Sequence, residues 1–502
     1  MEPNTSSDQR PVIQASEILA KIERDEDVKY DGVIVEGDLD ISGLDLRTED
    51  VDRESDSVHS VGLGVSDELK VIVSEMTITN SEIKGKVNFS NARFQEPINF
   101  NGAYFGGDAS FIGAKFTGNA SFTEANFAGS VCFGEAEFSG DAYFFRAKFG
   151  WDAKFWITKF CGCANFNAAK FGKNADFASA VFSDGGAHFT DAKFTGGDAR
   201  FQGAKFAGNA NFVKAEFAGG DANFAYAVFS GGNANFLWTE FNGGNAFFID
   251  AEFGGNALFM GSTFGRIAFF IDAKFRGDAT FGAANLGGAA TFGADADFGG
   301  AKFSGEAGFS GAKFGAYANF MKAEFDNKLK LGNFKSEGLY ITWNSIKDKL
   351  VYSGPAYLAL IKNFKALEQF DDADDCYYQY RRESQDRKKL YDNEKGWDWS
   401  KFMDIISWIS CGYGVRPLHT VLSIFGVVFI IGIIFLGYFD SIFESFYFSI
   451  MTFTGGLITF TGGEADILIE ERWLRSLAMI EAILGYLLMA LFVVVLARKF
   501  IR

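Results

Sequence analysis

The chain has 502 residues, with 47 Lys and Arg against 64 Asp and Glu, and its formal net charge is -17. This acidic balance argues against a nucleic-acid phosphate partner, because such partners are bound through positive charge. The 60 Phe, 58 Gly and only 5 Pro exclude an ordinary globular composition and indicate an internal repeat, and five irregularly placed cysteines fit a reducing compartment, not a disulfide framework.

Residues 1–88 carry the signals of a cap and the start of a repeat. Ala15–Arg24 places apolar side chains at helical spacing, which predicts a short amphipathic helix. Gly32–Leu46 and Lys70–Ile83 alternate apolar and polar residues with a period of two, as half-buried strands do. We interpret 1–88 as an N-terminal cap and the first irregular coils, which cover the otherwise exposed edge of the repeat that begins at residue 89.

Residues 89–325 repeat a short unit of the form Ala-x-Phe. The intervals between successive phenylalanines alternate between five and six residues, and Gly with Asp or Asn fills the longer interval. No helix or single strand has this period. Short extended faces joined by tight turns must therefore be stacked into a solenoid.

This pattern resembles the pentapeptide-repeat family, whose units form a right-handed quadrilateral β-helix. The resemblance implies that each Phe, and the Ala two positions before it, points inward. We expect about eleven coils at a spacing of ~4.8 Å, with a protein partner on the surface of the solenoid. The resemblance and the acidity also raise the hypothesis of a DNA mimic that blocks a nucleic-acid enzyme. The interspersed lysines and the membrane-length apolar runs near the C-terminus weaken it, so no nucleic-acid partner is expected.

The pattern of residues 326–396 predicts a helical cytosolic linker. Pro355–Leu390 keeps apolar residues on one helical face before a charged run. The Lys and Arg of that run are interpreted either as a contact to anionic headgroups or as a solvated helix face. Residues 397–416 begin with WDWSKFMDIISWI, which gathers large apolar side chains on one side and predicts a helix in the cytoplasmic membrane interface.

The C-terminal part of the chain, residues 417–502, holds two apolar runs of membrane-spanning length. Pro417–Phe439 and Trp473–Ala497 are each about as long as a helix that crosses ~30 Å of hydrocarbon. Between them, Asp440–Thr454 is apolar but too short to cross, which predicts a re-entrant helix. The ribbon Gly455–Gly463 (GGLITFTGG) cannot be helical throughout. Such backbone is tolerated at membrane depth only where protein buries it or where it lines water, as in an ion pore.

This part resembles the two-transmembrane pore domain of potassium-channel-like proteins. The likeness lies in Phe446–Thr454 (FYFSIMTFT) and in Leu477–Arg498, which is similar to that family's inner helix. The sequence departs from the family's Thr-x-Gly-Tyr-Gly-Asp filter, because no Gly-Tyr-Gly follows the threonines. The resemblance therefore implies the architecture, and with it a homotetramer around a shared axis, but not potassium selectivity. The filter residues that it implies are Thr452, Thr454, Gly455, Gly456, Thr459, Thr461, Gly462, Gly463 and Glu464.

Two residues of the second apolar run are candidate gating residues on the inner helix. Glu481 places an acid at mid-bilayer, at a cost of ~2.5 to 3.5 kcal/mol. It is interpreted either as a carboxylate near the pore or as a hydrogen-bond partner of the re-entrant helix. Gly485 is interpreted either as a hinge or as a small residue that permits close helix packing.

Flanking charge predicts the orientation of the hairpin. Arg416 precedes it and Arg498, Lys499 and Arg502 follow it, whereas the loop between the two runs is acidic. The positive-inside rule then places both termini and the solenoid in the cytoplasm, in a multi-pass protein of the cell membrane. The first residues carry no signal-peptide pattern.

These patterns together predict an oligomeric cation channel with a degenerate filter and a large cytosolic solenoid. It would touch membrane lipid, hold no bound cofactor and conduct a monovalent cation, with K+ among the candidates. The alternative is a membrane-anchored interaction scaffold whose pore-like anchor does not conduct. The sequence shows no nucleotide loop, catalytic triad or metal motif, so no enzyme activity is expected.

Overall fold

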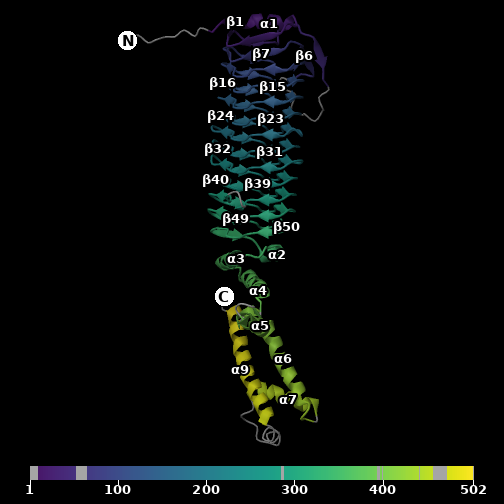
Figure 1. The fold of residues 1–502 in the computed structure, drawn as a ribbon, viewed down its shortest axis with the longest axis vertical. Helices are drawn as coiled ribbons and strands as arrows, with labels where there is room; N and C mark the ends of the chain where they lie inside the picture. The colour runs from purple at the N-terminus through teal and green to yellow at the C-terminus, as the bar shows by residue number, and fades with distance from the viewer. Residues whose placement is uncertain are drawn as a thin grey trace, which may run out of the picture. The chain divides into compact units, whose positions relative to one another are not determined.

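The computed structural model divides the chain into two compact units, Met1–Val351 and Tyr352–Arg502, called here the solenoid unit and the helical unit (Figure 1). The residues that it describes are 10–51, 65–283, 288–389, 391–392, 396–397, 399–439, 441–455 and 472–500.

The solenoid unit consists of four sheets of thirteen strands each, which the chain visits in turn. Neighbouring strands are parallel, except that β6 (Glu68–Ile72) pairs antiparallel with β5. One coil contains β16 (Asn126–Phe127), β17 (Val131–Cys132), β18 (Glu137–Phe138) and β19 (Ala142–Tyr143). The first and last strands are β1 (Val12–Gln14) and β48 (Lys313–Phe314) in sheet A, β2 (Val28–Asp31) and β51 (Leu329–Lys330) in sheet B, β4 (Leu39–Asp40) and β52 (Gly338–Tyr340) in sheet C, and β5 (Thr48–Asp50) and β50 (Glu324–Phe325) in sheet D. The predicted four-sided β-solenoid is therefore confirmed.

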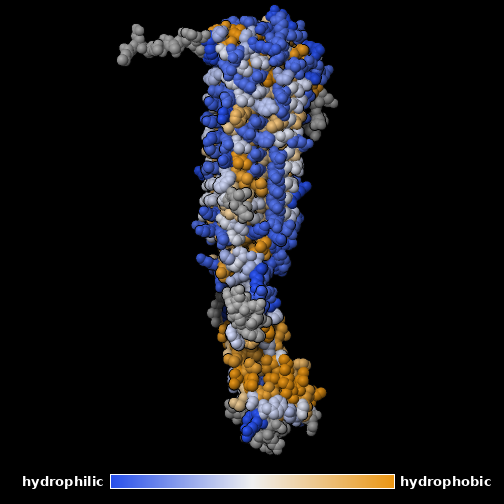
Figure 2. All heavy atoms as spheres, viewed as in Figure 1, coloured by the Kyte–Doolittle hydropathy of each residue, from blue (hydrophilic) through white to orange (hydrophobic). Residues whose placement is uncertain are grey.

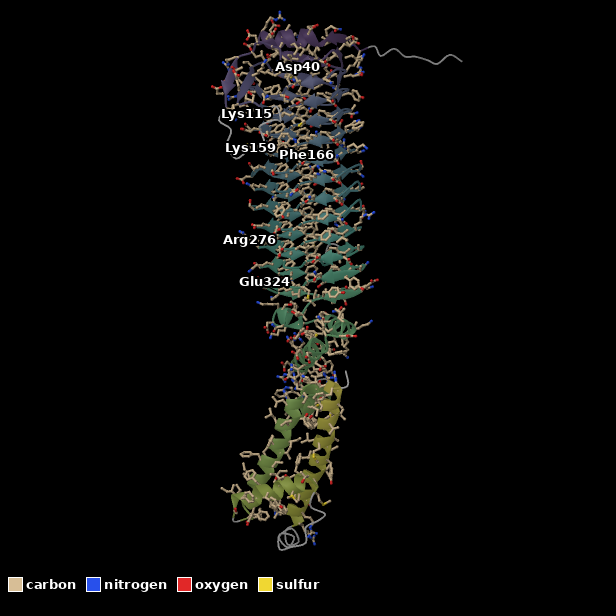
Figure 3. The ribbon with its side chains drawn as sticks, turned by 180° about the vertical axis from the view of Figure 1, so that it is seen from behind. Asp40, Lys115, Lys159, Phe166, Arg276 and Glu324 are labelled. Atoms are coloured by element: carbon tan, nitrogen blue, oxygen red, sulfur yellow. The ribbon has the colours of Figure 1, made fainter. Side chains whose placement is uncertain are left out.

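Columns of phenylalanine rings fill the interior of the solenoid unit. Phe166 is fully buried, and its ring stacks on Phe144 at 4.7 Å and on Phe189 at 4.9 Å between centroids (Figure 3). The inward Ala of each strand is buried as well, for example Ala164. Burial of one such ring contributes about 1.5 to 3 kcal/mol. The predicted inward direction of Phe and Ala is confirmed.

Charged side chains follow the outer faces of the same strands. Lys115, Lys159 and Glu324 lie along one edge of the solenoid unit and point away from its core (Figure 3). Lys115 pairs with Glu137 of the next coil at 2.8 Å. Such half-exposed pairs contribute at most about 1 kcal/mol each, so the core and not the surface carries the stability.

The solenoid extends beyond 89–325 at both ends. Its strands begin at Val12 and continue to Tyr340, because Ile, Val and Leu take the inward positions where the Ala-x-Phe unit fades. Two short helices then bury apolar side chains at the ends: α1 (Ala15–Glu23), as expected near this position, and α2 (Trp343–Ile346). Covered end strands cannot pair with further chains.

The corners of the solenoid are of two kinds. In the first kind, Ala125 N–H donates to the Phe122 carbonyl at 3.1 Å across a turn in which Glu124 has a φ of 59°. In the second kind, the backbones of successive coils touch at glycines. A Cβ on Gly129 would lie 2.7 Å from backbone atoms of Gly107 in the preceding coil, closer than real Cβ contacts. The extra glycines of the longer intervals therefore permit close stacking.

The stacked glycines give a test of this packing. Gly129→Ala is expected to lower the free energy of unfolding by about 1 to 3 kcal/mol, because the added methyl group must push two coils apart. The control is Gly43→Ala, since a Cβ on Gly43 would meet no atom within 4 Å. Thermal unfolding of the full chain, followed by the β-sheet circular dichroism signal, measures the difference. Equal midpoints for the two variants would contradict the close-stacking account.

Among the described residues, the helical unit contains the remaining helices. In chain order they and the two strands among them are α3 (Gly354–Ala366), α4 (Phe370–Arg387), β53 (Tyr391–Asp392), β54 (Gly396–Trp397), α5 (Trp399–Cys411), the 3-10 turn η1 (Gly412–Gly414), α6 (Pro417–Phe435), α7 (Ile442–Phe453) and α9 (Arg472–Phe500). The helices predicted within 326–396 and 397–416 are present as α3, α4 and α5.

The basic run at the end of α4 contacts α5. Arg381 and Lys388 both pair with Asp404, whose carboxyl is buried. Arg382 places its guanidinium 4.1 Å from the centre of the Trp408 ring. These contacts join α4 to α5, a role that neither interpretation of the run had named.

Candidate functional site

Two helices of the helical unit are long and apolar enough to cross a membrane. They are α6 and α9, with 19 and 29 residues, and only 22% of the most apolar stretch of each is buried. Large apolar side chains such as Phe425, Ile430 and Leu487 are more than half exposed. Figure 2 shows apolar side chains covering the visible face of these helices. A soluble protein rarely exposes so large an apolar surface, so lipid or other protein is needed to cover it.

Helix α7 lies between the ends of α6 and α9 that are far from α5 (Figure 1). Its 12 residues span ~18 Å, which is too short to cross a bilayer. Phe448 of α7 packs with Ile431 and Phe435 of α6 and with Leu474 and Ala478 of α9 in one buried cluster. The short helix is therefore held by both long ones.

A buried carboxyl joins α7 to α9. Glu481 is fully buried, and it accepts hydrogen bonds from the hydroxyls of Ser449 and Thr452 on α7. Ser449 Oγ also lies 3.0 Å from the carbonyl oxygen of Val428 on α6. The three helices thus meet at one polar contact, and this geometry corresponds to the second interpretation of Glu481, a hydrogen-bond partner for the short helix.

Gly485 lies one helical turn further along α9, at the C-terminal end of α7. A Cβ on Gly485 would lie 1.9 Å from the carbonyl oxygen of Phe453, a distance that no side chain can occupy. Helix α9 continues through this position from Arg472 to Phe500. The contact corresponds to the packing interpretation of Gly485.

The predicted filter residues fall into three groups. Thr452 is buried against Glu481. Thr454 is exposed, and its hydroxyl donates back to the carbonyl of Ile450 at 2.9 Å, so it caps α7. Gly455 follows with a φ of 80°. Those outside the described residues are Gly456, Thr459, Thr461, Gly462, Gly463 and Glu464.

Two further residues at this site were not singled out from the sequence. Ser449 stands three positions before Thr452, so both side chains lie on one face of the helix. Ser449 could have been predicted by assuming that this face meets Glu481, the only acid of the second apolar run. The hydroxyl of Tyr486 lies against Gly455, because a Cβ added to Gly455 would be only 2.0 Å from that oxygen. That contact has no signal in the sequence, because it joins a helix to the first residue of the ribbon.

An apolar groove of about 750 Å³ opens on the surface of the helical unit beside α7. Phe425 and Phe429 of α6, Phe446 and Ile450 of α7 and Met489 of α9 line it. Its mostly apolar lining suits a lipid tail or an apolar helix face.

Comparison with known proteins finds one family model that matches a part of the chain. Residues 78–126 match the model for pentapeptide repeats (9 copies). No curated protein and no solved structure matches the chain. The pentapeptide-repeat prediction is therefore confirmed for the start of the repeat, and the likeness of the helical unit to a two-transmembrane pore remains a prediction.

Proposed function

We propose that the chain forms a homotetrameric cation channel in the cell membrane, with the ribbon Gly455–Gly463 of each copy around a shared axis and the solenoid unit in the cytoplasm. The observation that carries this proposal is the position of α7. A helix too short to cross is held between two membrane-length helices, and the chain passes from its last turn directly into the ribbon. The C-terminus of a helix carries partial negative charge, which favours a cation at the start of the ribbon.

The exposed apolar surface supports assembly in a membrane. One copy encloses no path for an ion, so several copies must surround an axis. The groove beside α7 and the exposed sides of α6 and α9 leave room for neighbouring copies as well as lipid. Trp399 and Met403 of α5 are 73% and 60% exposed, which supports its proposed position in the cytoplasmic interface. Arg416 precedes the N-terminus of α6 and Arg498 lies near the C-terminus of α9. In the antiparallel pair these two ends lie on the same side, which the positive-inside rule assigns to the cytoplasm.

The permeant ion of the proposed channel is a monovalent cation. Ribbon carbonyls and threonine hydroxyls can replace the water around such an ion. Without Gly-Tyr-Gly the ribbon lacks the family's potassium signature, so we expect weak discrimination between K+ and Na+ and exclusion of Cl-.

Reconstitution of the full-length protein in planar bilayers tests the proposal. We expect currents carried by K+ and Na+, with a reversal potential that follows the cation gradient and not the Cl- gradient. A subunit count in mild detergent should give four chains of 55.1 kDa. A non-conducting monomer would overturn the proposal and favour the membrane-anchored scaffold.

A further inference from the structure

One turn of α4 contacts the N-terminal end of α6 and the C-terminal end of α9. The residue before α6 and two residues in the last turn of α9 pair with aspartates of α4. The three ion pairs are Arg416 with Asp375 at 2.9 Å, Arg498 with Asp374 at 3.1 Å and Lys499 with Asp371 at 3.8 Å. We call this set of contacts the clasp.

The aspartates of the clasp share one face of α4. Asp371, Asp374 and Asp375 stand at positions i, i+3 and i+4, so a helix brings their carboxyls together. Asp374 is only 7% exposed, and a buried carboxylate needs a partner of opposite charge. Arg498 supplies that charge and also donates to the carbonyl oxygen of Gly414, just before α6, at 3.4 Å. The end of α9 is thereby tied to the start of α6.

The clasp is built on the contact between α4 and α5. Helix α4 is joined to α5 through the Asp404 pairs and through the hydrogen bond from Trp408 Nε1 to Tyr378 Oη at 3.0 Å. The guanidinium of Arg416 lies 4.9 Å from the centre of the same Tyr378 ring. In sequence, α4 is preceded only by α3 within the helical unit, so the chain enters the membrane helices through α4 and α5.

We propose that the clasp controls the gate of the channel, with Asp371, Asp374 and Asp375 as positioning residues. This inference rests on the proposed function. The clasp lies at the opposite end of α6 and α9 from α7, so it does not contact the helix that leads into the proposed filter. Because it holds α9 to its own α6, it opposes convergence of the α9 ends of different copies on the shared axis. An intact clasp therefore keeps that end open, and its release lets the four ends close.

Neutralising the three aspartates tests the clasp. The variant carries Asp371→Asn, Asp374→Asn and Asp375→Asn, which keep the size of the side chains. The matched control is Asp386→Asn, which removes one charge from an exposed position of the same helix. A second variant, Asp374→Arg with Arg498→Asp, rebuilds one pair with its charges exchanged, and distinguishes loss of the contact from loss of folding.

Two measurements on the full-length chain in lipid give independent results. Hydrogen exchange of residues 490–500 is expected to rise about tenfold in the triple variant, because the ion pairs that hold the end of α9 to α4 are lost. The single-channel open probability is expected to fall by a similar factor, and both values should return towards the wild type in the exchanged pair.

Three outcomes would overturn the inference. They are unchanged exchange in the triple variant, raised exchange with an unchanged or raised open probability, and equal effects of Asp386→Asn. A wild type that passes no current would overturn the proposed function and with it the gating role. The exchange comparison would still decide whether the clasp holds the end of α9, so the two failures are distinguishable.

Discussion

Gly485→Ala is expected to displace α7 and abolish the current. The added Cβ would lie 1.9 Å from the carbonyl oxygen of Phe453 and 2.8 Å from its carbonyl carbon. These are backbone atoms, which cannot rotate aside as a long side chain does, so the whole C-terminal turn of α7 must move. We expect a cost of about 3 kcal/mol, at the upper end of the range for overpacked sites.

Gly426→Ala is the matched control. Gly426 is also a helix glycine of a membrane-length run, but a Cβ there would meet no atom within 4 Å. Both substitutions gain the same helix propensity, so the difference between them isolates the contact with Phe453. Hydrogen exchange of residues 442–455 and bilayer current measure the effect. If Gly485 were a hinge instead, exchange in α7 would stay at the level of the control while gating changed.

The interior of the solenoid could be predicted because one residue type marks it. Each Phe of the repeat, such as Phe166, occupies the same inward position, and a fixed spacing of a large apolar residue determines the coil. The first and last residues of the solenoid could not be predicted in this way. Leu329, Leu331 and Leu339 are buried at inward positions of the last coils, yet leucine occurs in every kind of apolar segment and carries no periodic signal over so short a stretch.

The contacts of the helical unit show where sequence reasoning stops. Apolar length identified both long helices, and the isolated acid and glycine of the second identified Glu481 and Gly485. Two interpretations stayed open for each, because periodicity does not say which face of α9 meets α7. The clasp depends on pairs such as Arg498 and Asp374, 124 residues apart, and only the packed helices bring them together.

Glu481→Ala is expected to release α7 from α9 at a cost of about 3 to 5 kcal/mol. The substitution leaves a cavity in a fully buried position and removes the shared acceptor of the Ser449 and Thr452 hydroxyls. Each hydroxyl keeps a nearby carbonyl, since Ser449 Oγ lies 3.0 Å from Val428 O and Thr452 Oγ1 lies 2.9 Å from Ser449 O. The loss therefore falls on the junction between the helices and not on the fold of α7 itself, and hydrogen exchange of 442–455 should report it.

Glu481→Gln separates the two roles that the acid could have. The amide keeps the shape of the side chain and one accepting oxygen, so a junction that needs only packing and hydrogen bonds should keep most of its stability and its current. A carboxylate that acts by its charge on the passing ion would lose conductance as fully in Glu481→Gln as in Glu481→Ala, while exchange in α7 stayed low for Gln. Because the carboxyl faces two hydroxyls of its own chain in a buried site, we expect the first result, with single-channel conductance near the wild-type value in Glu481→Gln.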